Sequence, residues 1–380
     1  MTLPCQRDRF DLPDEVTYLN CCYMSPQLKS VTEAGQQAVA RKGRPWELAP
    51  VDFFTESEAL RSAYAEMIEA EADDVALIPS ASYGLALAAR NLPLSSGQQV
   101  LVLENQFPSN VYVWKERCRE VGAELRFLEA SPGQTLSECV LKAIGANTGI
   151  VAVPNAHWSD GRWLDLVGIG ARCREVGAAL ALDLTQSLGA APFSVQEVQP
   201  DFMISAGYKW LCGPYSLGML YAAPCWQEGI PLEHNWIARQ QSEDFRNLVN
   251  YQDGFQPGVR RYDVGERSNF VLVPMALAST RQLLEWTVPE IAETLWKLTG
   301  TVAESGREFG LEVLPEVERA PHFLGLRNPK GWPDHLGGTL AERKVFVSFR
   351  GEWMRVSPHL YNTSEEVDRL FAELRSLRDT

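Results

Sequence analysis

The stretch SAGYKWLCGP, residues 205–214, places Lys209 just after an apolar run at 202–204 that is typical of a buried strand. Burying a lysine ammonium group costs free energy, so a lysine in such a place is normally replaced or paired. The exception is a lysine whose neutral amine acts as a nucleophile or is bonded to a carbonyl group. Gly207 before it and a Gly-Pro pair after it favour a tight turn. Lys209 is therefore a candidate catalytic residue.

Strand-like and helix-like stretches alternate on both sides of this turn. Helical patterns cover residues 84–90, 110–121, 136–144 and 166–176. Short apolar runs, typical of strands, cover residues 75–78, 99–103, 124–128, 149–153, 178–182, 202–205 and 217–221. This alternation predicts an α/β fold, a doubly wound and mostly parallel sheet that is covered by helices on both faces.

The two ends of the chain differ from this middle part. Residues 1–50 are expected to be irregular, and TESE at 55–58 fits a capping box that opens a helix running to about residue 70. After residue 269 come helical patterns at 273–285 and 288–309, short strands at 322–326, 345–349 and 354–356, and a capping box, TSEE at 363–366. We predict an N-terminal segment (1–20), a large domain (21–267) and a small C-terminal α+β domain (268–380).

The composition disfavours several classes of function. The formal net charge is -14, which argues against binding to nucleic acid or to an anionic membrane. No apolar run approaches the length of a membrane span. Charged residues stand near the N-terminus where a signal peptide needs an apolar core, so we expect a cytoplasmic location. The 8 cysteines are scattered without a CxxC pair, so we expect reduced thiols and no metal site.

Polar residues gather at the predicted carboxyl ends of strands, where open α/β sheets bind ligands. Ser80-Ala81-Ser82 opens a helix whose free N–H groups and hydroxyls could hold a phosphate, with an ordinary serine cap as the alternative. Asp183 ends a buried run and needs a partner, such as a protonated ring nitrogen, unless it caps a helix. Gln186 could bond a phenolic oxygen of the same ring. Together, these polar residues at the strand ends are suited to bind a phosphorylated, aromatic cofactor that carries a carbonyl group.

Further residues are candidates for contacts with a flat ring or a substrate. Phe107 precedes a proline turn and could stack on a ring, although an aromatic residue there is more often in the core. His157 and Trp158 lie on a strand-end loop and could contact a substrate, unless the histidine is structural. Arg355 suits bidentate capture of a carboxylate, with a surface ion pair as the alternative. Other aromatic candidates for a substrate pocket are Tyr23, Trp46 and Trp236.

Taken together, these motifs resemble those of pyridoxal-phosphate (PLP) enzymes of fold type I, and more narrowly the class V aminotransferase group. That group includes kynureninases, cysteine desulfurases, selenocysteine lyases and isopenicillin-N epimerase-like proteins. The resemblance spans about residues 15–375 and rests on FPSN (107–110), DLTQSLG (183–189), GYKWLCGP (207–214) and the segment from Arg355 to Glu366. It implies a mixed, mostly parallel seven-stranded sheet plus a smaller C-terminal α+β domain.

The resemblance also implies a role for each matching residue. Lys209 would form a Schiff base with PLP and later move protons at the substrate Cα. Asp183 would pair with the pyridine nitrogen, and Gln186 would bond the phenolic oxygen. Arg355 would bind the substrate carboxylate. Phe107 would stack on the cofactor ring. Ala81, Ser82 and Tyr208 would bind the phosphate of their own subunit. The resemblance also implies a homodimer, in which Ser268 and Asn269 would bind the phosphate in the partner's site.

Departures from the group narrow the activity. The last cysteine is Cys225, so the C-terminal loop lacks the cysteine with which desulfurases receive sulfur. Phe107 stands where desulfurases usually have histidine. In this it resembles the ring-stacking residue of kynureninase-type members. Gly207 stands where a serine is common, so one phosphate contact is missing or comes from elsewhere. We expect a lyase that cleaves a Cβ bond (C–S, C–Se or C–C) of an L-α-amino acid. Transamination, epimerisation and cofactor binding without turnover are the alternatives.

Overall fold

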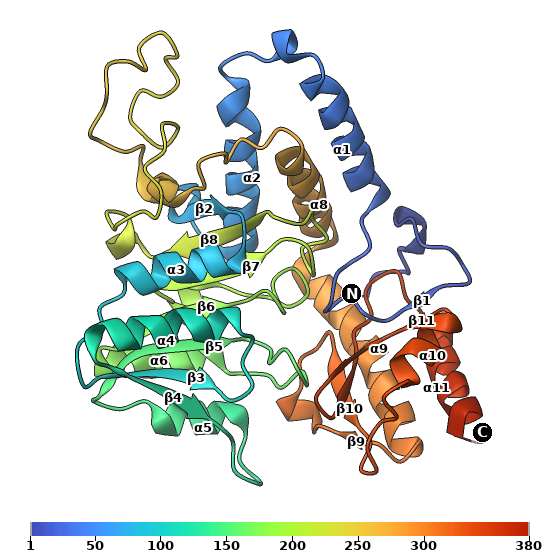
Figure 1. Ribbon diagram of the computed structural model, residues 1–380. Coiled ribbons are helices and arrows are strands. Elements are labelled where there is room, and N and C mark those ends of the chain that lie inside the picture. The colour runs from blue at the N-terminus through green and yellow to red at the C-terminus, as the bar shows by residue number, and fades with distance from the viewer. Residues whose placement is uncertain (1, 379–380) are drawn as a thin grey trace.

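The computed structural model describes residues 2–378 and shows a large sheet with helices on both faces, joined to a smaller C-terminal domain (Figure 1). The large sheet has 7 strands in the order β2-β8-β7-β6-β5-β3-β4. All neighbouring strands in it are parallel except at β8, which runs antiparallel to β7 and β2. The strands are β2 (Val75–Ile78), β3 (Gln99–Leu103), β4 (Glu124–Leu128), β5 (Thr148–Pro154), β6 (Ala179–Asp183), β7 (Phe202–Ala206) and β8 (Gly218–Ala222). The predicted mixed, mostly parallel sheet is confirmed.

Two sets of helices cover the two faces of this sheet. Side chains alternate between the faces along each strand, so Ala76 and Ile78 of β2 pack on one side while Val75 and Leu77 pack on the other. The first side is covered by α3 (Ala81–Asn91) and α4 (Ser109–Val121). The other is covered by α2 (Asp52–Ile68), α5 (Leu136–Ala143), α6 (Leu166–Val176), α7 (Val195–Val198) and α8 (Leu272–Trp286).

A glycine brings α3 close to the sheet. A Cβ atom added to Gly84 would lie 2.8 Å from side-chain carbons of both Ile78 and Ile204. Any larger residue would push the helix away from β2 and β7, because buried side chains there leave no free space. The first turn of α3 is therefore held directly beyond the carboxyl end of β2.

The smaller domain is built on a four-stranded antiparallel sheet in the order β12-β13-β10-β9. Leu19, near the N-terminus, belongs to its core, so the first residues of the chain pack on this domain. The division at residue 268 stays a prediction. The elements of this part are β1 (Thr17–Tyr18), α9 (Val288–Glu308), β9 (Glu312–Val313), β10 (Leu324–Arg327), α10 (Leu336–Glu342), β11 (Val345–Phe346), β12 (Ser348–Arg350), β13 (Trp353–Val356) and α11 (Ser364–Arg378), with β1 paired in parallel to β11.

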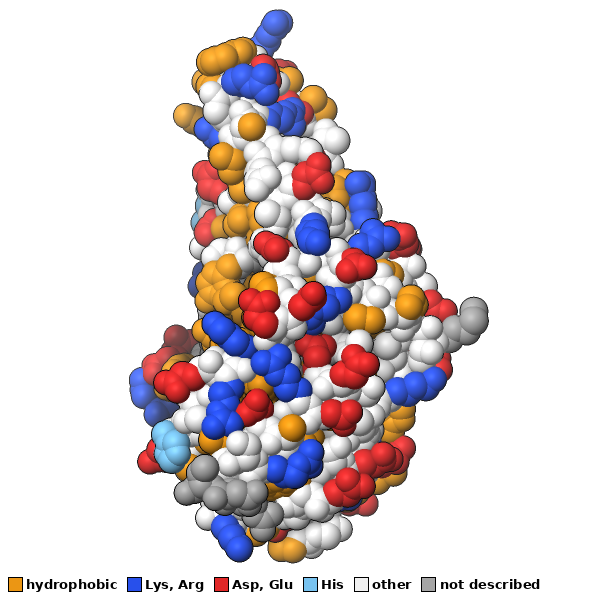
Figure 2. All heavy atoms as spheres, turned by 90° about the vertical axis from the view of Figure 1, so that its right-hand side faces the viewer, with side chains coloured by type: hydrophobic (Ala, Val, Ile, Leu, Met, Phe, Trp, Pro, Cys, Tyr) orange, Lys and Arg blue, Asp and Glu red, His pale blue; other side chains and the backbone are white. Residues whose placement is uncertain are grey.

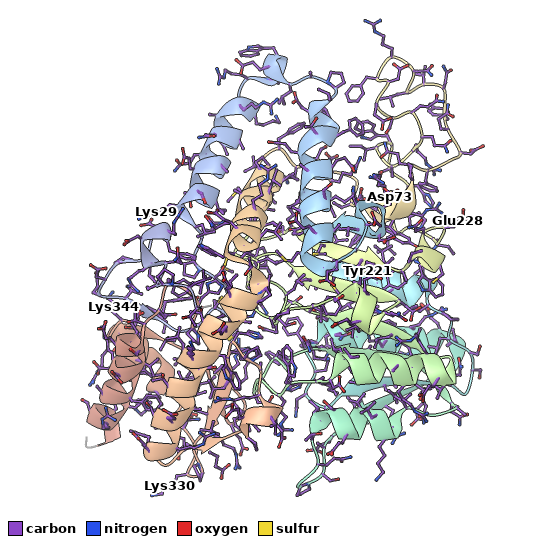
Figure 3. All side chains as sticks on the ribbon, turned by 180° about the vertical axis from the view of Figure 1, so that it is seen from behind. Lys29, Asp73, Tyr221, Glu228, Lys330 and Lys344 are labelled. Atoms are coloured by element: carbon purple, nitrogen blue, oxygen red, sulfur yellow. The ribbon has the colours of Figure 1, made fainter. Side chains whose placement is uncertain are left out.

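The prediction that residues 1–50 are irregular is wrong, because α1 (Lys29–Lys42) lies within them. Its buried face consists of small residues, and an added Cβ at Gly35 would lie 2.8 Å from the sulfur of Met275 in α8. The spacing of apolar residues in α1 is thus too weak to predict the helix from the sequence unless the partner helix is known. Figure 3 shows α1, α8 and α2 side by side from behind.

The predicted capping box at residues 55–58 is also wrong. Helix α2 begins at Asp52, whose carboxylate accepts a hydrogen bond from the backbone N–H of Ala49 (2.7 Å). Thr55 lies inside the helix and donates its hydroxyl to the carbonyl oxygen of Val51 (3.0 Å). A Ser/Thr-x-x-Glu pattern therefore marks the start of a helix only when the helix does not begin at an earlier residue.

The outer surface carries both signs of charge. Figure 2 shows Lys and Arg side chains interspersed with Asp and Glu over the face that bears the small domain and α1. In the described part of the chain, no helix combines the length and the apolar character that crossing a membrane requires.

A buried cluster of ions ties the segment before residue 268 to the sheet. The carboxylate of Asp263, fully buried, lies 2.7 Å from Nη2 of Arg61 and 3.1 Å from Nη1 of Arg267. It also accepts the backbone N–H of Leu77 in β2 (2.7 Å). Glu58 completes the cluster, and the surrounding arginines hold the pKa of its carboxyl below the usual range against the effect of burial.

Replacing Asp263→Asn should lower the free energy of unfolding by about 3–5 kcal/mol, because it removes the fully buried one of the two carboxylates that balance the charges of Arg61 and Arg267. Urea denaturation followed by circular dichroism measures this change. As a control, Glu47→Gln removes an exposed partner of Arg44 (3.1 Å) and should shift the value by less than about 1 kcal/mol. Equal effects of the two substitutions would contradict a structural role for the cluster.

Candidate active site

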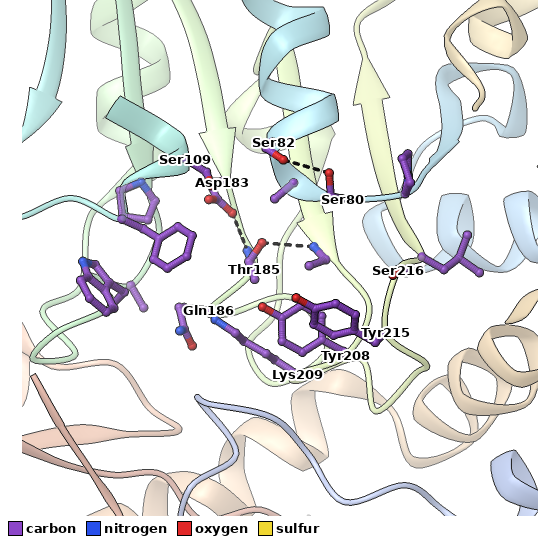
Figure 4. Close-up of a pocket in the computed structure, with 18 of the residues that line it drawn as sticks. Ser80, Ser82, Ser109, Asp183, Thr185, Gln186, Tyr208, Lys209, Tyr215 and Ser216 are labelled. Carbon is purple, nitrogen blue, oxygen red and sulfur yellow. Dashed lines mark hydrogen bonds between the residues drawn. The ribbon is translucent and has the colours of Figure 1, made fainter. Parts of the chain in front are cut away.

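A cavity of about 240 Å³ lies at the carboxyl edge of the large sheet (Figure 4). The ends of the parallel strands β2, β3, β5, β6 and β7 meet here, and antiparallel β8 begins here. Eight predicted site residues line it, namely Ala81, Ser82, Phe107, Trp158, Asp183, Gln186, Tyr208 and Lys209. The topology thus brings together residues as far apart in the sequence as Ala81 and Lys209.

The turn that carries Lys209 depends on a glycine. The N–H of Gly207 donates to the carbonyl oxygen of Leu217 (2.9 Å), and the carbonyl of Gly207 accepts from Gly213 (2.9 Å). A Cβ atom on residue 207 would lie 2.6 Å from the Leu217 oxygen. A serine therefore does not fit in this turn, which explains the departure noted in the sequence.

The amine of Lys209 is buried among aromatic rings. Its Nζ lies 5.7 Å from the ring centre of Phe107 and 5.6 Å from that of Tyr208. The pKa of Lys209 is lowered to about 8, mainly by burial and also by Arg355 and Arg350, against the opposing effects of Cys22 and Asp183. At neutral pH about one amine in ten is thus uncharged, which is what a nucleophilic lysine requires.

Asp183 ends β6 and points into the same cavity (Figure 4). Burial raises the pKa of Asp183, while hydrogen bonding from Thr185 lowers it. The backbone N–H of Thr185 donates to Oδ1 of Asp183 (3.0 Å), and the Thr185 hydroxyl accepts from the N–H of Ala206 in β7 (3.1 Å). These bonds orient the carboxylate within the cavity.

Gln186 is held in one orientation by the protein. Its Oε1 accepts from the indole N–H of Trp210 (3.2 Å), and its Nε2 donates to the carbonyl oxygen of Cys22 (3.0 Å). An amide nitrogen carries two hydrogens, so one donor remains for a group in the cavity.

The start of α3 forms the wall opposite Tyr208. Ser80 is an ordinary helix cap, since its hydroxyl accepts from the N–H of Tyr83 (3.2 Å). The hydroxyls of Ser80 and Ser82 lie 2.9 Å apart. Backbone N–H groups in the first turn of a helix have no partner within the helix and attract anions. Burial raises the pKa of Tyr208 to about 12, so its hydroxyl remains a hydrogen-bond donor.

Arg355 lies beside this cavity rather than in its wall. Its Nη1 donates to the carbonyl oxygen of Trp158 (2.7 Å), and its Nε and Nη2 donate to the hydroxyl of Ser348 (3.1 and 2.9 Å). Trp158 in turn meets Phe107 edge-on, with 5.4 Å between ring centres. Two of the five N–H bonds of Arg355 remain for a ligand.

Several predicted residues are not brought into the cavity. His157 is buried, with Nε2 3.2 Å from the carbonyl oxygen of Glu104 and Nδ1 2.9 Å from the Ser159 hydroxyl. Asn269 accepts backbone N–H groups of Val271 (3.1 Å) and Leu272 (2.9 Å) at the start of α8. The others outside it are Ser268, which is buried nearby in the chain, and Tyr23, Trp46 and Trp236, which are partly exposed elsewhere.

Sequence reasoning missed other residues of the wall. Thr185 stands inside the motif that contains Asp183, so its hydroxyl could have been noticed. Tyr215 and Ser216 precede β8, and nothing in the sequence shows that this strand runs antiparallel. Further missed residues are Gln106 and Ser109.

The residues present fit PLP. A buried amine of lowered pKa is available for the aldehyde, Asp183 for a protonated ring nitrogen, and the α3 terminus with Tyr208 for the phosphate. Within residues 2–378 no group of three or more His, Cys, Asp or Glu side chains is arranged to hold a metal ion.

The lowered pKa of Lys209 can be measured directly. Competitive labelling of the cofactor-free protein with acetic anhydride, followed by mass spectrometry, should give half-maximal reactivity of Lys209 near pH 8. Asp183→Asn should lower this midpoint, because the carboxylate raises the pKa, and Arg355→Gln should raise it, because the guanidinium lowers the pKa. A wild-type midpoint at the ordinary value of 10.5 would contradict the burial of the amine.

Comparisons with known proteins agree with this geometry. The model of the aminotransferase class-V family matches residues 30–234. The chain is 25% identical to the uncharacterized aminotransferase YcbU of Bacillus subtilis, over 94% of this chain and 93% of that protein. It is 28% identical to a cysteine desulfurase of Klebsiella pneumoniae subsp. pneumoniae, over 84% and 82%. Among solved structures it is similar to the cystine C–S lyase C-DES in complex with cysteine persulfide, with a TM-score of 0.83, 18% identity and coverage of 95% and 97%.

The structural similarity confirms the fold type I architecture, since it extends over nearly the whole of both chains. The family model matches more than half of the chain and includes the segments that carry Asp183 and Lys209. The protein therefore belongs to the aminotransferase class-V family, whose members are PLP-dependent enzymes.

Proposed function

We propose that this enzyme cleaves a Cβ bond of an L-α-amino acid, with Lys209 as the residue that bonds PLP. The observation that carries the proposal is the buried amine of Lys209, of lowered pKa, in a cavity that Asp183 also lines. Lysine, carboxylate and anion-binding helix terminus meet at one sheet edge, where ligands of open α/β sheets bind.

We assign the residues around Lys209 to the parts of the cofactor that their chemistry suits. Asp183 pairs with the ring nitrogen, and the free hydrogen of the Gln186 amide bonds the phenolic oxygen. Phe107, whose ring is a neighbour of Nζ, covers the cofactor ring. The phosphate lies against the backbone of Ala81 and the hydroxyls of Ser82 and Tyr208, and Ser216 is available in place of the serine missing at residue 207.

Lys209 also serves as the proton carrier in this proposal. Pyridoxal phosphate, when bound, withdraws electrons from the α-carbon of an attached amino acid. A lysine with a pKa of about 8 both accepts and returns protons near neutral pH, because its two forms are close in free energy. Arg355 holds the substrate carboxylate with its two remaining N–H bonds, and the protein bonds from its other three prevent it from turning away.

Two observations favour a lyase that releases its product directly. The chain has no cysteine after Cys225, so no thiol in the C-terminal loop can receive sulfur from the substrate. Phe107 stands beside Lys209 where desulfurases usually have histidine. The name of the Bacillus relative instead favours an aminotransferase, which is the second candidate.

We further propose a homodimer in the cytoplasm. Asn269 is exposed and lies outside the cavity of its own chain, which is consistent with a contact to the partner's phosphate site, whereas Ser268 beside it is buried. Aromatic side chains exposed on the single chain, such as Tyr215 near the cavity mouth, support such an interface. The 8 free cysteines suit a reducing compartment.

Incubating the holoenzyme with single amino acids and no keto acid separates the candidates. The panel is cysteine, cysteine conjugates, kynurenine, alanine and aspartate. A Cβ lyase should accumulate pyruvate or alanine beyond one equivalent per active site, whereas an aminotransferase should stop at one equivalent of keto acid. Product assay by mass spectrometry decides between them, and release of one equivalent only would reject the lyase.

Lys209→Ala should lower turnover by about 10³-fold or more, because it removes both the bonding amine and the proton carrier. The matched control is Lys297→Ala, at an exposed lysine on α9 that pairs with Glu293 (3.6 Å), and it should retain full turnover. Initial rates and circular dichroism of both variants are compared with wild type. Full turnover in a correctly folded Lys209→Ala protein would reject the assignment.

A further inference from the structure

A second cleft, of about 880 Å³, opens beside the cavity of Lys209, between the large domain and the β12–β13 hairpin. Trp158 lines both spaces. Its indole N–H donates to the carbonyl oxygen of Asn105 (2.6 Å), which holds the ring in place. The second cleft therefore adjoins the cavity of Lys209 at Trp158.

The hairpin presents two arginines to this position. Strands β12 and β13 pair so that Ser348 stands opposite Arg355 and Arg350 opposite Trp353. Because side chains alternate along a strand, all four share one face of the hairpin. The guanidinium carbons of Arg350 and Arg355 lie 5.5 and 5.7 Å from the ring centre of Trp158.

Within residues 2–378 Arg350 has no acidic partner, unlike Arg162 and Arg327 of the same cleft. Its Nη1 donates to the carbonyl oxygen of Phe349 (2.6 Å), and in the part of the chain that the structure describes it makes no ion pair. Arg327 of the same cleft binds both Glu312 (2.6 Å) and Glu352 (2.9 Å). Arg350 is partly buried, and the N–H bonds that do not bind Phe349 stay available to a ligand.

Three of the five carboxyl groups that line the cleft are engaged by its other arginines. Asp160 is engaged by Arg162 (3.3 Å) and by Nδ1 of His157 (3.2 Å). Glu104 and Glu129 line the side that belongs to the large domain and make no ion pair with Arg350 within residues 2–378.

We propose that Arg350 binds a second acidic group of the substrate, so that the enzyme selects L-α-amino acids with a side-chain carboxylate or sulfinate. The inference rests on the proposed function, in which Arg355 holds the α-carboxylate. A planar guanidinium that is already partly removed from water binds such anions with two parallel hydrogen bonds. A dianionic substrate also offsets the mutual repulsion of Lys209, Arg350 and Arg355, which act on one another electrostatically.

The test compares L-cysteine sulfinate with L-cysteine, which share the Cβ–S bond and differ in the acidic group. In the wild-type holoenzyme, kcat/KM should be higher for the sulfinate. Arg350→Gln should lower kcat/KM for the sulfinate by about 10- to 100-fold, mainly through KM, and should lower the value for cysteine by less than about threefold. Arg350→Lys, which keeps the charge without the planar fork, should fall between.

Arg327→Gln is the matched control, since it removes an arginine of the same cleft that already has two carboxylate partners. It should leave both substrates unaffected. Equal losses on both substrates with Arg350→Gln, or a wild-type preference for cysteine, would overturn the inference and leave the lyase proposal standing.

Binding of succinate to the holoenzyme, measured by calorimetry, gives a readout that is independent of turnover. Its affinity should fall about 10- to 100-fold in Arg350→Gln, while the affinity for propionate, with one carboxylate, should change little. If no amino acid is turned over, the proposed function fails, and an unchanged succinate affinity then also overturns the role of Arg350.

Discussion

The hydrogen bond from the N–H of Gly207 to the carbonyl oxygen of Leu217 (2.9 Å) is the contact on which the active site depends. It closes the segment between β7 and β8, which run in opposite directions, so both ends of that segment lie at one edge of the sheet. Only glycine allows the approach, since a Cβ would lie 2.6 Å from the Leu217 oxygen. The turn directs Lys209 into the cavity and brings Ser216 to its rim.

The small domain and the N-terminal segment complete a site that the large sheet begins. Burial lowers the pKa of His322 to about 4, so its ring is neutral and its Nε2–H donates to the carbonyl of Gln186. The carbonyl of Cys22 holds the side-chain amide of the same glutamine (3.0 Å), and Arg355 holds the loop of Trp158 (2.7 Å). Movement between the domains would therefore disturb the residues that face Lys209.

Much of the architecture could be read from local patterns. Runs such as Val75–Ile78 are apolar at every position because helices cover both faces of a parallel sheet, and in the large sheet the predicted strand bounds differ from the observed ones by one residue at most. In the small domain the prediction is poorer, since the expected strand at 345–349 is divided into β11 and β12. Helix α1 could not be read this way, because Gly35 packs against Met275, more than two hundred positions away. A small-residue face becomes interpretable only when the partner helix is known.

The sequence by itself determined the parallel sheet, the lysine turn and the carboxylate of Asp183, because a buried strand that ends in a charged residue is a local signal. Tertiary structure decided which side chains meet. It kept His157 bonded away from the cavity of Lys209, and it placed Tyr215 in the wall through the reversed direction of β8. It also left Arg350 beside Trp158 without an ion pair among the described residues, since pairing depends on distances that no spacing along the chain encodes.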